Sequence, residues 1–143
     1  MKKTRRGSCH CGAVRFEADV DLTEGTGKCN CSFCAKTRSW GVQVKPEDFR
    51  LLAGEDALSD YQFGTKSVHH LFCRRCGVRP FGRGYVEAIG GAFVSLQVSC
   101  LDDVDPAELA ALPVHVANGR EDRWWEQPAE ARHLRSEGHT SEL

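Results

Sequence analysis

Two stretches of the chain alternate hydrophobic and polar residues with a period of two, the pattern of half-buried β-strands, and two further stretches are also predicted to be strands. In the first of them Val14 and Phe16 flank Arg15, so the two apolar side chains would share one face of a sheet. The segments between the stretches are rich in Gly, Asp and Pro, and those at 52–56 and 82–84 are predicted to be turns. The four predicted strands cover residues 13–18, 40–44, 67–72 and 92–98.

The strongest helical signal lies near the C-terminus, at residues 105–112. Asp105 suits the N-cap position, Pro106 suits the first helical position and Pro113 ends the helix. A shorter helical turn is expected at residues 31–37. Because the chain has no internal repeat, low-complexity tract or long linker, we predict a single, mainly β domain with one short helix near its C-terminus.

The composition fits one domain and limits its partners. The chain has 143 residues, of which 41% are hydrophobic and 27% are charged, which is ordinary for a single globular domain. Its formal net charge is -1 at pH 7. The sequence therefore lacks the basic excess with which proteins bind nucleic acid or anionic membranes, and neither partner is favoured.

The N-terminal segment predicts a location for the protein. A basic segment at residues 2–6 is not followed by the apolar stretch of a secretory signal. The longest apolar stretches, near 92–98 and 107–117, are too short and too polar to span a membrane. We therefore expect a cytoplasmic protein. Thiols stay reduced in that compartment, so its cysteines more often bind metals than form disulfides.

Eight cysteines are the unusual feature of the composition. Cys100 stands alone in a strand-like segment and is expected to be a buried thiol. The other seven fall into three groups whose spacing brings sulfurs to a common point, as a tetrahedral metal ion requires. Zinc is favoured over an iron–sulfur cluster because all-thiolate sites suit it. The groups are Cys9 and Cys11; Cys29, Cys31 and Cys34; and Cys73 and Cys76.

Seven clustered thiolates do not divide by four, so the simplest partition is one site with four cysteines and one with three. A closed four-cysteine zinc site is structural, whereas three protein ligands leave a fourth position for water or substrate. Spacing alone would allow a zinc ribbon of Cys31, Cys34, Cys73 and Cys76. It equally allows the first and third groups to combine, which leaves Cys29 with Cys31 and Cys34 as the open site. We prefer the second partition, because one local turn can preorganise three adjacent ligands.

The cysteine groups and their neighbours resemble a known family. The segments GSCHCGAVRF at 7–16, CNCSFC at 29–34 and FCRRCG at 72–77 are similar to the glutathione-dependent formaldehyde-activating enzyme family, which shares its domain with centromere protein V. A softer likeness continues through 100–105 and 118–120. The resemblance therefore covers most of the chain.

The resemblance implies a fold and a set of metal ligands. The fold would be a β-tent, in which several coiled β-sheets are pinned by zinc, in a domain at 5–128 followed by a C-terminal tail at 129–143. Two zinc ions per chain are implied. The structural zinc would lie on Cys9, Cys11, Cys73 and Cys76, and the catalytic zinc on Cys29, Cys31 and Cys34.

The activity implied by the resemblance is the condensation of glutathione, or a similar thiol, with formaldehyde or another small aldehyde. This carbon–sulfur bond formation is formally lyase chemistry and would serve aldehyde detoxification. An open zinc could hold the thiol as a thiolate or polarise the aldehyde oxygen. Three thiolate ligands leave the site with a net negative charge, which weakens Lewis acidity and favours positioning of the thiol. The alternative is a non-catalytic zinc-binding module for protein or nucleic acid.

Polar residues beside the cysteine groups supply further candidates. His10, His69 and His70 could act as a fourth ligand or a general base, although a solvated or hydrogen-bonded histidine is the commoner situation. Nearby basic residues could offset the negative thiolates or bind the carboxylates of a glutathione-like thiol. These basic residues are Lys28, Lys36, Arg38, Arg74 and Arg75.

Overall fold

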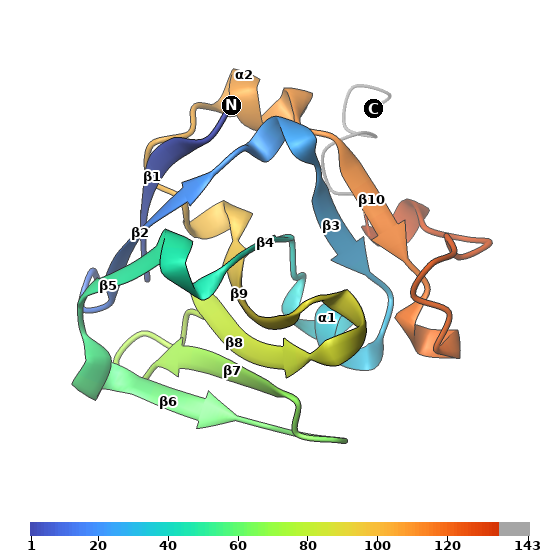
Figure 1. Ribbon diagram of the computed structural model, residues 1–143, viewed down its shortest axis with the longest axis horizontal. Helices are drawn as coiled ribbons and strands as arrows, with labels where there is room; N and C mark the ends of the chain where they lie inside the picture. The colour runs from blue at the N-terminus through green and yellow to red at the C-terminus, as the bar shows by residue number, and fades with distance from the viewer. Residues whose placement is uncertain (135–143) are drawn as a thin grey trace.

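The computed structural model describes residues 1–134 and is mainly β, with two sheets and two short α-helices among those residues (Figure 1). This architecture confirms the predicted fold class. Neither of the described helices is long and apolar enough to cross a membrane. The helices are α1 (Ser32–Thr37) and α2 (Pro106–Ala111). The strands are β1 (Lys3–Ser8), β2 (Arg15–Val20), β3 (Thr26–Cys29), β4 (Gly41–Val44), β5 (Phe49–Ala53), β6 (Leu58–Tyr61), β7 (Val68–Cys73), β8 (Phe81–Val86), β9 (Gly91–Gln97) and β10 (Val114–Ala117).

The smaller sheet has three antiparallel strands in the order β1-β2-β5. Ser8 pairs with Arg15 at the end of the β1–β2 hairpin, so the first cysteine group occupies its connecting loop. On β5, the Arg50 side chain donates through Nε to Glu17 Oε1 of β2 at 2.7 Å. This sheet therefore holds the first cysteine group at the tip of a hairpin.

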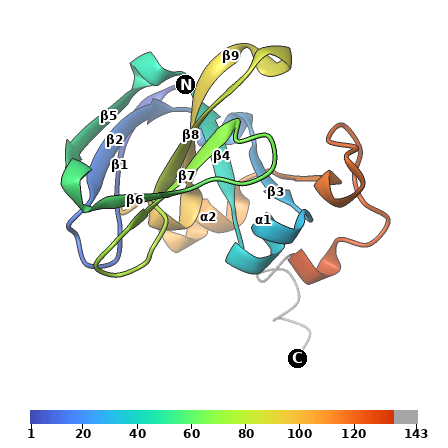
Figure 2. The same ribbon diagram turned by 90° about the horizontal axis from the view of Figure 1, so that it is seen from below.

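The larger sheet has seven strands in the order β10-β3-β4-β9-β8-β7-β6. β10 runs parallel to β3, and Ala117 lies beside Cys29, so the chain leaving β10 passes the second cysteine group. The third group begins at Cys73, the last residue of β7. In Figure 2 the smaller sheet and α1 lie on opposite sides of the molecule. The first and second cysteine groups are therefore far apart in the fold.

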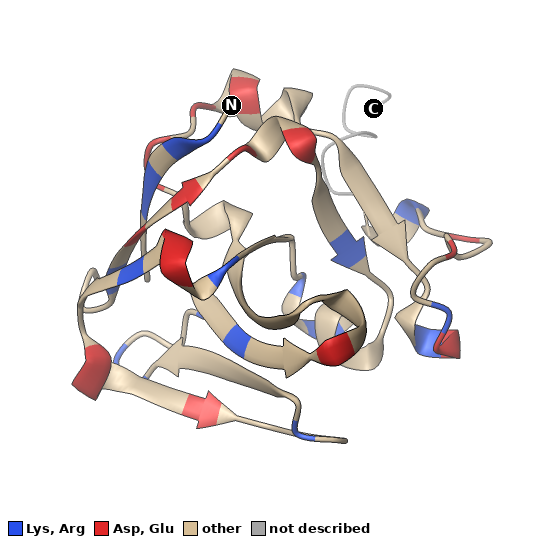
Figure 3. Ribbon diagram, in the orientation of Figure 1, with Lys and Arg blue, Asp and Glu red and all other residues tan. Residues whose placement is uncertain are grey.

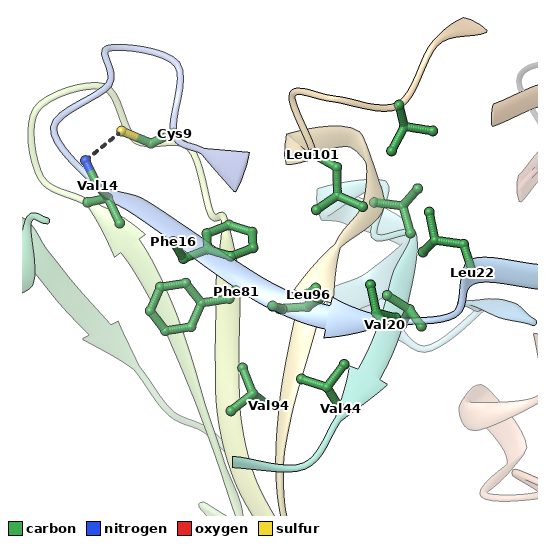
Figure 4. Packing of buried hydrophobic residues seen from close by; sticks show 14 of the residues in the cluster. Cys9, Val14, Phe16, Val20, Leu22, Val44, Phe81, Val94, Leu96 and Leu101 are labelled. Atoms are coloured by element: carbon green, nitrogen blue, oxygen red, sulfur yellow. Dashed lines mark hydrogen bonds between the residues drawn. The ribbon is translucent and has the colours of Figure 1, made fainter. Parts of the chain in front are cut away.

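Three phenylalanines form the centre of the hydrophobic core. Phe16 on β2 and Phe81 on β8 are fully buried, and Phe49 on β5 packs against both. Ring centroids are 5.6 Å apart for Phe16 and Phe49, and 4.7 Å apart for Phe49 and Phe81. Figure 4 shows Phe16 and Phe81 next to each other, with Leu96 beyond them. Because these rings come from both sheets, the core joins the two sheets to each other.

The four predicted strands are confirmed, since β2, β4, β7 and β9 each begin within two residues of a predicted stretch. The turn predicted at 82–84 is wrong, because these residues lie inside β8. A β-carbon on Gly82 would come within 2.9 Å of the His69 carbonyl oxygen, and one on Gly84 within 2.6 Å of the Phe93 ring. These glycines allow neighbouring groups to approach the strand closely, a role that a local turn signal does not distinguish.

Both helices lie where the sequence predicts them. Asp105 caps α2 by accepting a hydrogen bond from the Glu108 backbone N–H at 2.8 Å, and Pro106 occupies the first helical position. Cys31 caps α1 with its sulfur, which accepts from the Cys34 backbone N–H at 3.3 Å. A candidate metal ligand therefore caps the N-terminus of α1.

The predicted tail at 129–143 lies partly outside the described residues. Its described part ends in the 3₁₀ turn Arg132–Leu134, where Leu134 is buried. The Leu134 carbonyl accepts a hydrogen bond from Lys28 Nζ at 3.1 Å, and the His133 carbonyl accepts from Arg38 Nη1 at 3.1 Å. These contacts hold the turn against the two segments that flank the second cysteine group.

The predicted turn at 52–56 contains a glycine that nothing larger can replace without strain. Gly54 has a φ of +92°, and a β-carbon there would collide with the Ala13 carbonyl and lie 2.7 Å from Val14 Cα. We expect Gly54→Ala to lower the free energy of unfolding by about 3 kcal/mol, since it combines left-handed strain with overpacking. Urea unfolding followed by circular dichroism measures this loss.

Gly64→Ala is the matched control for this prediction. Gly64 also has a positive φ, +60°, but its β-carbon would meet nothing within 4 Å. The control should lose only about 1 kcal/mol, the cost of the left-handed backbone alone. Equal losses in the two variants would contradict the steric role of Gly54.

Candidate metal centres

The first and third cysteine groups meet in space. Cys9 and Cys11 lie in the loop after β1, and Cys73 and Cys76 lie at the end of β7 and in the loop that follows. Their four sulfurs are all within 4.8 Å of one another. We call this set the four-cysteine cluster. It joins a hairpin of the smaller sheet to a hairpin of the larger sheet, and it is the set that locality favoured over the zinc ribbon.

The geometry of the four-cysteine cluster fits a tetrahedral metal ion. The Cys11 sulfur lies 3.7 Å from the Cys9 sulfur and 3.7 Å from the Cys73 sulfur. A tetrahedral zinc with Zn–S bonds of about 2.3 Å requires sulfur–sulfur distances of about 3.8 Å. Four thiols are also the donor set typical of closed structural zinc sites. These residues could therefore hold a zinc ion with little movement.

Backbone N–H groups point at the sulfurs of this cluster. The Val14 N–H donates to the Cys9 sulfur at 3.3 Å, as the dashed line in Figure 4 marks. The N–H groups of Cys11 and Val78 lower the pKa of the Cys76 thiol to about 6. Hydrogen bonds of this kind favour the thiolate, the form that binds metal.

Two glycines turn the loops of the four-cysteine cluster. Gly12 and Gly77 follow the last cysteine of their groups and have φ values of +80° and +78°. The Gly12 N–H donates to the Cys9 carbonyl at 3.3 Å, and the Gly77 N–H donates to the Cys73 carbonyl at 2.8 Å. Glycine permits this left-handed conformation, so each loop folds back tightly around its two sulfurs.

The second cysteine group forms its own cluster. Cys29 ends β3, Cys31 caps α1 and Cys34 lies inside α1, and their sulfurs are within 4.8 Å of one another. The Cys31 N–H donates to the Cys29 sulfur at 3.3 Å. Among the described residues, no other His, Cys, Asp or Glu joins this three-cysteine cluster. A tetrahedral ion held there would keep one position for a ligand from outside the protein.

The three thiols of this cluster differ in how readily they lose a proton. Hydrogen bonds from Cys29 and Cys34 hold the pKa of the Cys31 thiol far below its usual value. Hydrogen bonding with Cys29 and Cys31, together with burial, raises the pKa of Cys34. Cys31, at the helix N-terminus, is therefore the first of the three to become a thiolate.

A buried asparagine braces the three-cysteine cluster. Asn30 donates through Nδ2 to Asn118 Oδ1 at 3.0 Å, and its Oδ1 accepts from the Arg120 N–H at 2.9 Å. The intervening Gly119 packs so closely that a β-carbon there would lie 2.6 Å from the Cys29 sulfur. The sequence analysis assigns no role to Asn30. Its place between two candidate ligands is the signal that could have found it.

Two cavities border α1. The larger, of about 880 Å³, borders Cys31 and Cys34, and we call it the apolar cavity. The other, of about 640 Å³, is lined by Arg38 and Arg79, and we call it the arginine pocket. Phe33 and His70 line both. The three-cysteine cluster, but not the four-cysteine cluster, therefore borders a cavity large enough for a small molecule.

Arg79 is a candidate residue that the sequence analysis missed. Its guanidinium carbon lies 4.8 Å from the centre of the Phe33 ring, and Nη2 donates to Thr37 Oγ1 at 3.4 Å. Burial lowers the pKa of this guanidinium from its very high ordinary value, and it remains a cation. No local spacing links Arg79 to α1, so only the fold brings them together.

The five predicted basic residues do not form one site. Arg38 lines the arginine pocket, and Lys28 lines a further pocket of about 490 Å³ that borders Cys29 and Cys34. Arg74, Arg75 and Lys36 are exposed. The first two line a small pocket of about 250 Å³ beside the loop of the third cysteine group. Basic residues on the surface are interleaved with acidic ones (Figure 3).

The three candidate histidines also separate. His10 is exposed, and His69 is paired through Nδ1 with Asp60 Oδ2 at 2.5 Å on the surface. His70 lines both the apolar cavity and the arginine pocket, with its ring centre 4.1 Å from that of Phe33. Its Nδ1 is buried and has no hydrogen-bond partner among the described residues. None of the three lies in a cysteine cluster.

Cys100 differs from its predicted environment. It lies in a 3₁₀ turn, Val98–Cys100, that follows β9, and it is half-buried. Its sulfur donates to the Arg79 carbonyl at 3.8 Å, and burial raises the pKa of the thiol to about 11. It belongs to neither cysteine cluster among the described residues. Cys100 is thus a protonated thiol on the wall of the arginine pocket.

Comparisons with known proteins agree with the resemblance seen in the sequence. A family model described as glutathione-dependent formaldehyde-activating enzyme matches residues 4–117. A Halomonas elongata protein, provisionally named a glutathione-dependent formaldehyde-activating enzyme, is 35% identical over 78 residues. That match covers 49% of this chain and 50% of the relative, so the chain spans about half of the relative's length.

A solved structure is similar to this fold. The crystal structure of a Rhodobacter sphaeroides protein matches with a TM-score of 0.66 and 31% sequence identity. The match covers 77% of this chain and 99% of that chain. The likeness therefore extends over nearly the whole of the second molecule.

The two clusters predict different outcomes when one cysteine is replaced. Elemental analysis of the purified protein should find two zinc ions per chain. Cys31→Ser should lose one of them and keep its circular dichroism spectrum, because the three-cysteine cluster borders cavities. Cys73→Ser should lose the fold, because its sulfur is fully buried where the two sheets meet.

Cys100→Ser is the control, and it should keep both zinc ions and the native fold. Equal destabilisation by Cys31→Ser and Cys73→Ser would contradict the assignment of one structural and one open site. One zinc per chain, or iron in place of zinc, would contradict the division into four and three ligands.

Proposed function

Because the chain belongs to the glutathione-dependent formaldehyde-activating enzyme family, we propose that it is a zinc-dependent enzyme that joins a thiol to an aldehyde. The thiol is glutathione or a similar molecule, and the aldehyde is formaldehyde or another small aldehyde. The reaction is formally that of a carbon–sulfur lyase. The observation that carries the proposal is the three-cysteine cluster, which has no fourth protein ligand among the described residues and borders cavities. A cytoplasmic location is part of the proposal.

The two cysteine clusters would bind two zinc ions with different roles. The four-cysteine cluster would hold the structural ion, and Cys29, Cys31 and Cys34 would hold the catalytic one. A zinc ion on three sulfurs would keep the substrate sulfur as a thiolate at neutral pH. Asn30 and the loop at 118–120 fix the positions of these ligands, as surrounding hydrogen bonds do in other metal sites.

The arginine pocket supports binding of the thiol. Glutathione carries two carboxylates, and guanidinium groups bind carboxylates through two parallel hydrogen bonds. Arg79 and Arg38 line this pocket beside α1, the helix that contains Cys34. Arg79 is stacked on Phe33, so its guanidinium is held in place before the substrate arrives. A thiol anchored there by a carboxylate would approach the three-cysteine cluster with its sulfur.

His70 supports proton transfer to the product oxygen. When the thiolate adds to the aldehyde carbon, the carbonyl oxygen becomes an alkoxide and must take up a proton. Burial lowers the pKa of His70, so its imidazole is neutral at neutral pH. His70 lines the cavity that borders Cys31 and Cys34, where a neutral imidazole can take up or donate a proton.

The alternative function is a zinc-binding module for nucleic acid or protein, and a binding experiment distinguishes it from the enzyme. The net charge of -1 does not favour nucleic acid. A gel shift with DNA or RNA that weakens as salt is added would support the module instead of the enzyme.

The proposed activity is tested directly by mixing the protein with glutathione and formaldehyde. We expect the protein to accelerate formation of the adduct, followed by NMR, over the uncatalysed rate. Cys31→Ser should abolish the acceleration, whereas Arg83→Gln, at an exposed position on β8, should retain it. No acceleration by the zinc-loaded wild type would contradict the proposed function.

If Arg79 binds a carboxylate of the thiol, its replacement should change the KM only for thiols that carry a carboxylate. Arg79→Gln should raise the KM for glutathione about tenfold or more, because one charge-assisted hydrogen bond is lost. With 2-mercaptoethanol, which has no carboxylate, the same variant should behave like the wild type. Arg83→Gln is the control, since Arg83 is an exposed arginine over the Phe49 and Phe81 rings on β8. An equal effect on both thiols would contradict carboxylate binding.

A further inference from the structure

The apolar cavity is larger than formaldehyde requires. Its volume of about 880 Å³ is within the range of roughly 300–1,000 Å³ that encloses drug-sized molecules. Formaldehyde consists of one carbon, one oxygen and their hydrogens, and at the three-cysteine cluster it would leave nearly all of this space unfilled. The cavity therefore has room for a substituent on the reacting carbon.

Aromatic and aliphatic side chains from several elements form the walls of the cavity. They come from α1, the loop between β6 and β7, the start of β7, the β8–β9 hairpin and the segment after β10. Figure 2 shows the segment after β10 on the same side of the molecule as α1. The main apolar contributors are Phe33, Phe63, Ile89, Phe93, Trp124 and Trp125. Such a lining favours an apolar ligand, and particularly an aromatic ring.

The charges around the cavity argue against a carboxylate there. Its lining, within the described part of the chain, contains no Lys or Arg. The acidic residue of the lining, Asp122, accepts a hydrogen bond from Trp124 Nε1 at 2.7 Å. The three-cysteine cluster at the base adds further negative charge when its thiols ionise. An anionic thiol such as glutathione therefore fits the arginine pocket, not this cavity.

The rim of the cavity exposes apolar surface to water. Trp125 is 75% exposed, Ile89 is 57% exposed and Phe63 is 43% exposed. Apolar side chains gathered around one opening are a common sign of a binding site. The lining also contains polar side chains, among them His70, Thr65 and Ser67. The cavity thus combines a large, mainly apolar wall with a few polar groups.

We infer that the aldehyde substrate carries an apolar, preferably aromatic, substituent, which occupies the apolar cavity while its carbonyl group lies at the three-cysteine cluster. This inference rests on the proposed function and names the class of its aldehyde. The thiol sulfur bonds to the carbonyl carbon, the π electron pair of the C=O bond moves to oxygen, and that oxygen takes the proton lost by the thiol. The product is a hemithioacetal, and nothing is oxidised or reduced.

The test compares phenylacetaldehyde with formaldehyde, each with glutathione and the zinc-loaded protein. We expect kcat/KM to be at least about tenfold higher for phenylacetaldehyde, since filling an apolar pocket gives discrimination of this order. Phe63→Ser and Trp125→Ser should each lower the ratio of the two kcat/KM values by about tenfold. Tyr85→Ser should leave the ratio unchanged, because Tyr85 is an exposed aromatic residue on β8 outside the cavity lining.

A binding measurement separates failure of this inference from failure of the proposed function. 2-Phenylethanol has the same carbon skeleton but cannot add a thiol, and we expect it to quench the fluorescence of Trp124 and Trp125. Quenching without catalysis of any aldehyde would contradict the proposed function, and the cavity would then be an apolar ligand site with no role in that reaction. Preference for formaldehyde with no quenching would overturn the inference. A dimer seen in analytical ultracentrifugation and dissociated by Trp125→Ser would also overturn the inference, because a second copy of the chain would then cover the rim of the cavity.

Discussion

The meeting of two hairpin loops at four sulfurs is the contact on which the rest of the structure depends. One loop belongs to the three-stranded sheet and the other to the seven-stranded sheet, so a metal ion on these sulfurs would tie the two sheets to each other. The aromatic rings of Phe16, Phe49 and Phe81 pack between the same two sheets. A metal ion bound by the four sulfurs would add a rigid link between the sheets to the packing of these rings.

The three-cysteine cluster has a different physical character, because it does not join the two sheets. Its ligands come from one short stretch of chain, and its surroundings are cavities instead of packed core. Its geometry is maintained by hydrogen bonds between Asn30 and the segment at 118–120. The two clusters therefore have separate surroundings, and under the proposed function stability would depend on one and reactivity on the other.

The sequence predicts local features well and long-range ones poorly. The cysteine spacing, the Asp105 cap and the strands with clear alternation are encoded by neighbours in the chain. β3 has the sequence TGKC, which does not alternate, and the glycines of β8 imitate a turn. Arg79 and the walls of the apolar cavity come together only through sheet pairing, so no spacing rule could have connected them with Cys34.

The parallel pairing of β10 with β3 has a consequence for the order in which the molecule is assembled. During synthesis, all cysteines of the three-cysteine cluster are present once residue 34 has been added. Those of the four-cysteine cluster are all present once residue 76 has been added. The groups that brace Asn30 emerge only with residues 118–120. On the ribosome, therefore, the four-cysteine cluster can form before the three-cysteine cluster acquires the hydrogen bonds that brace it.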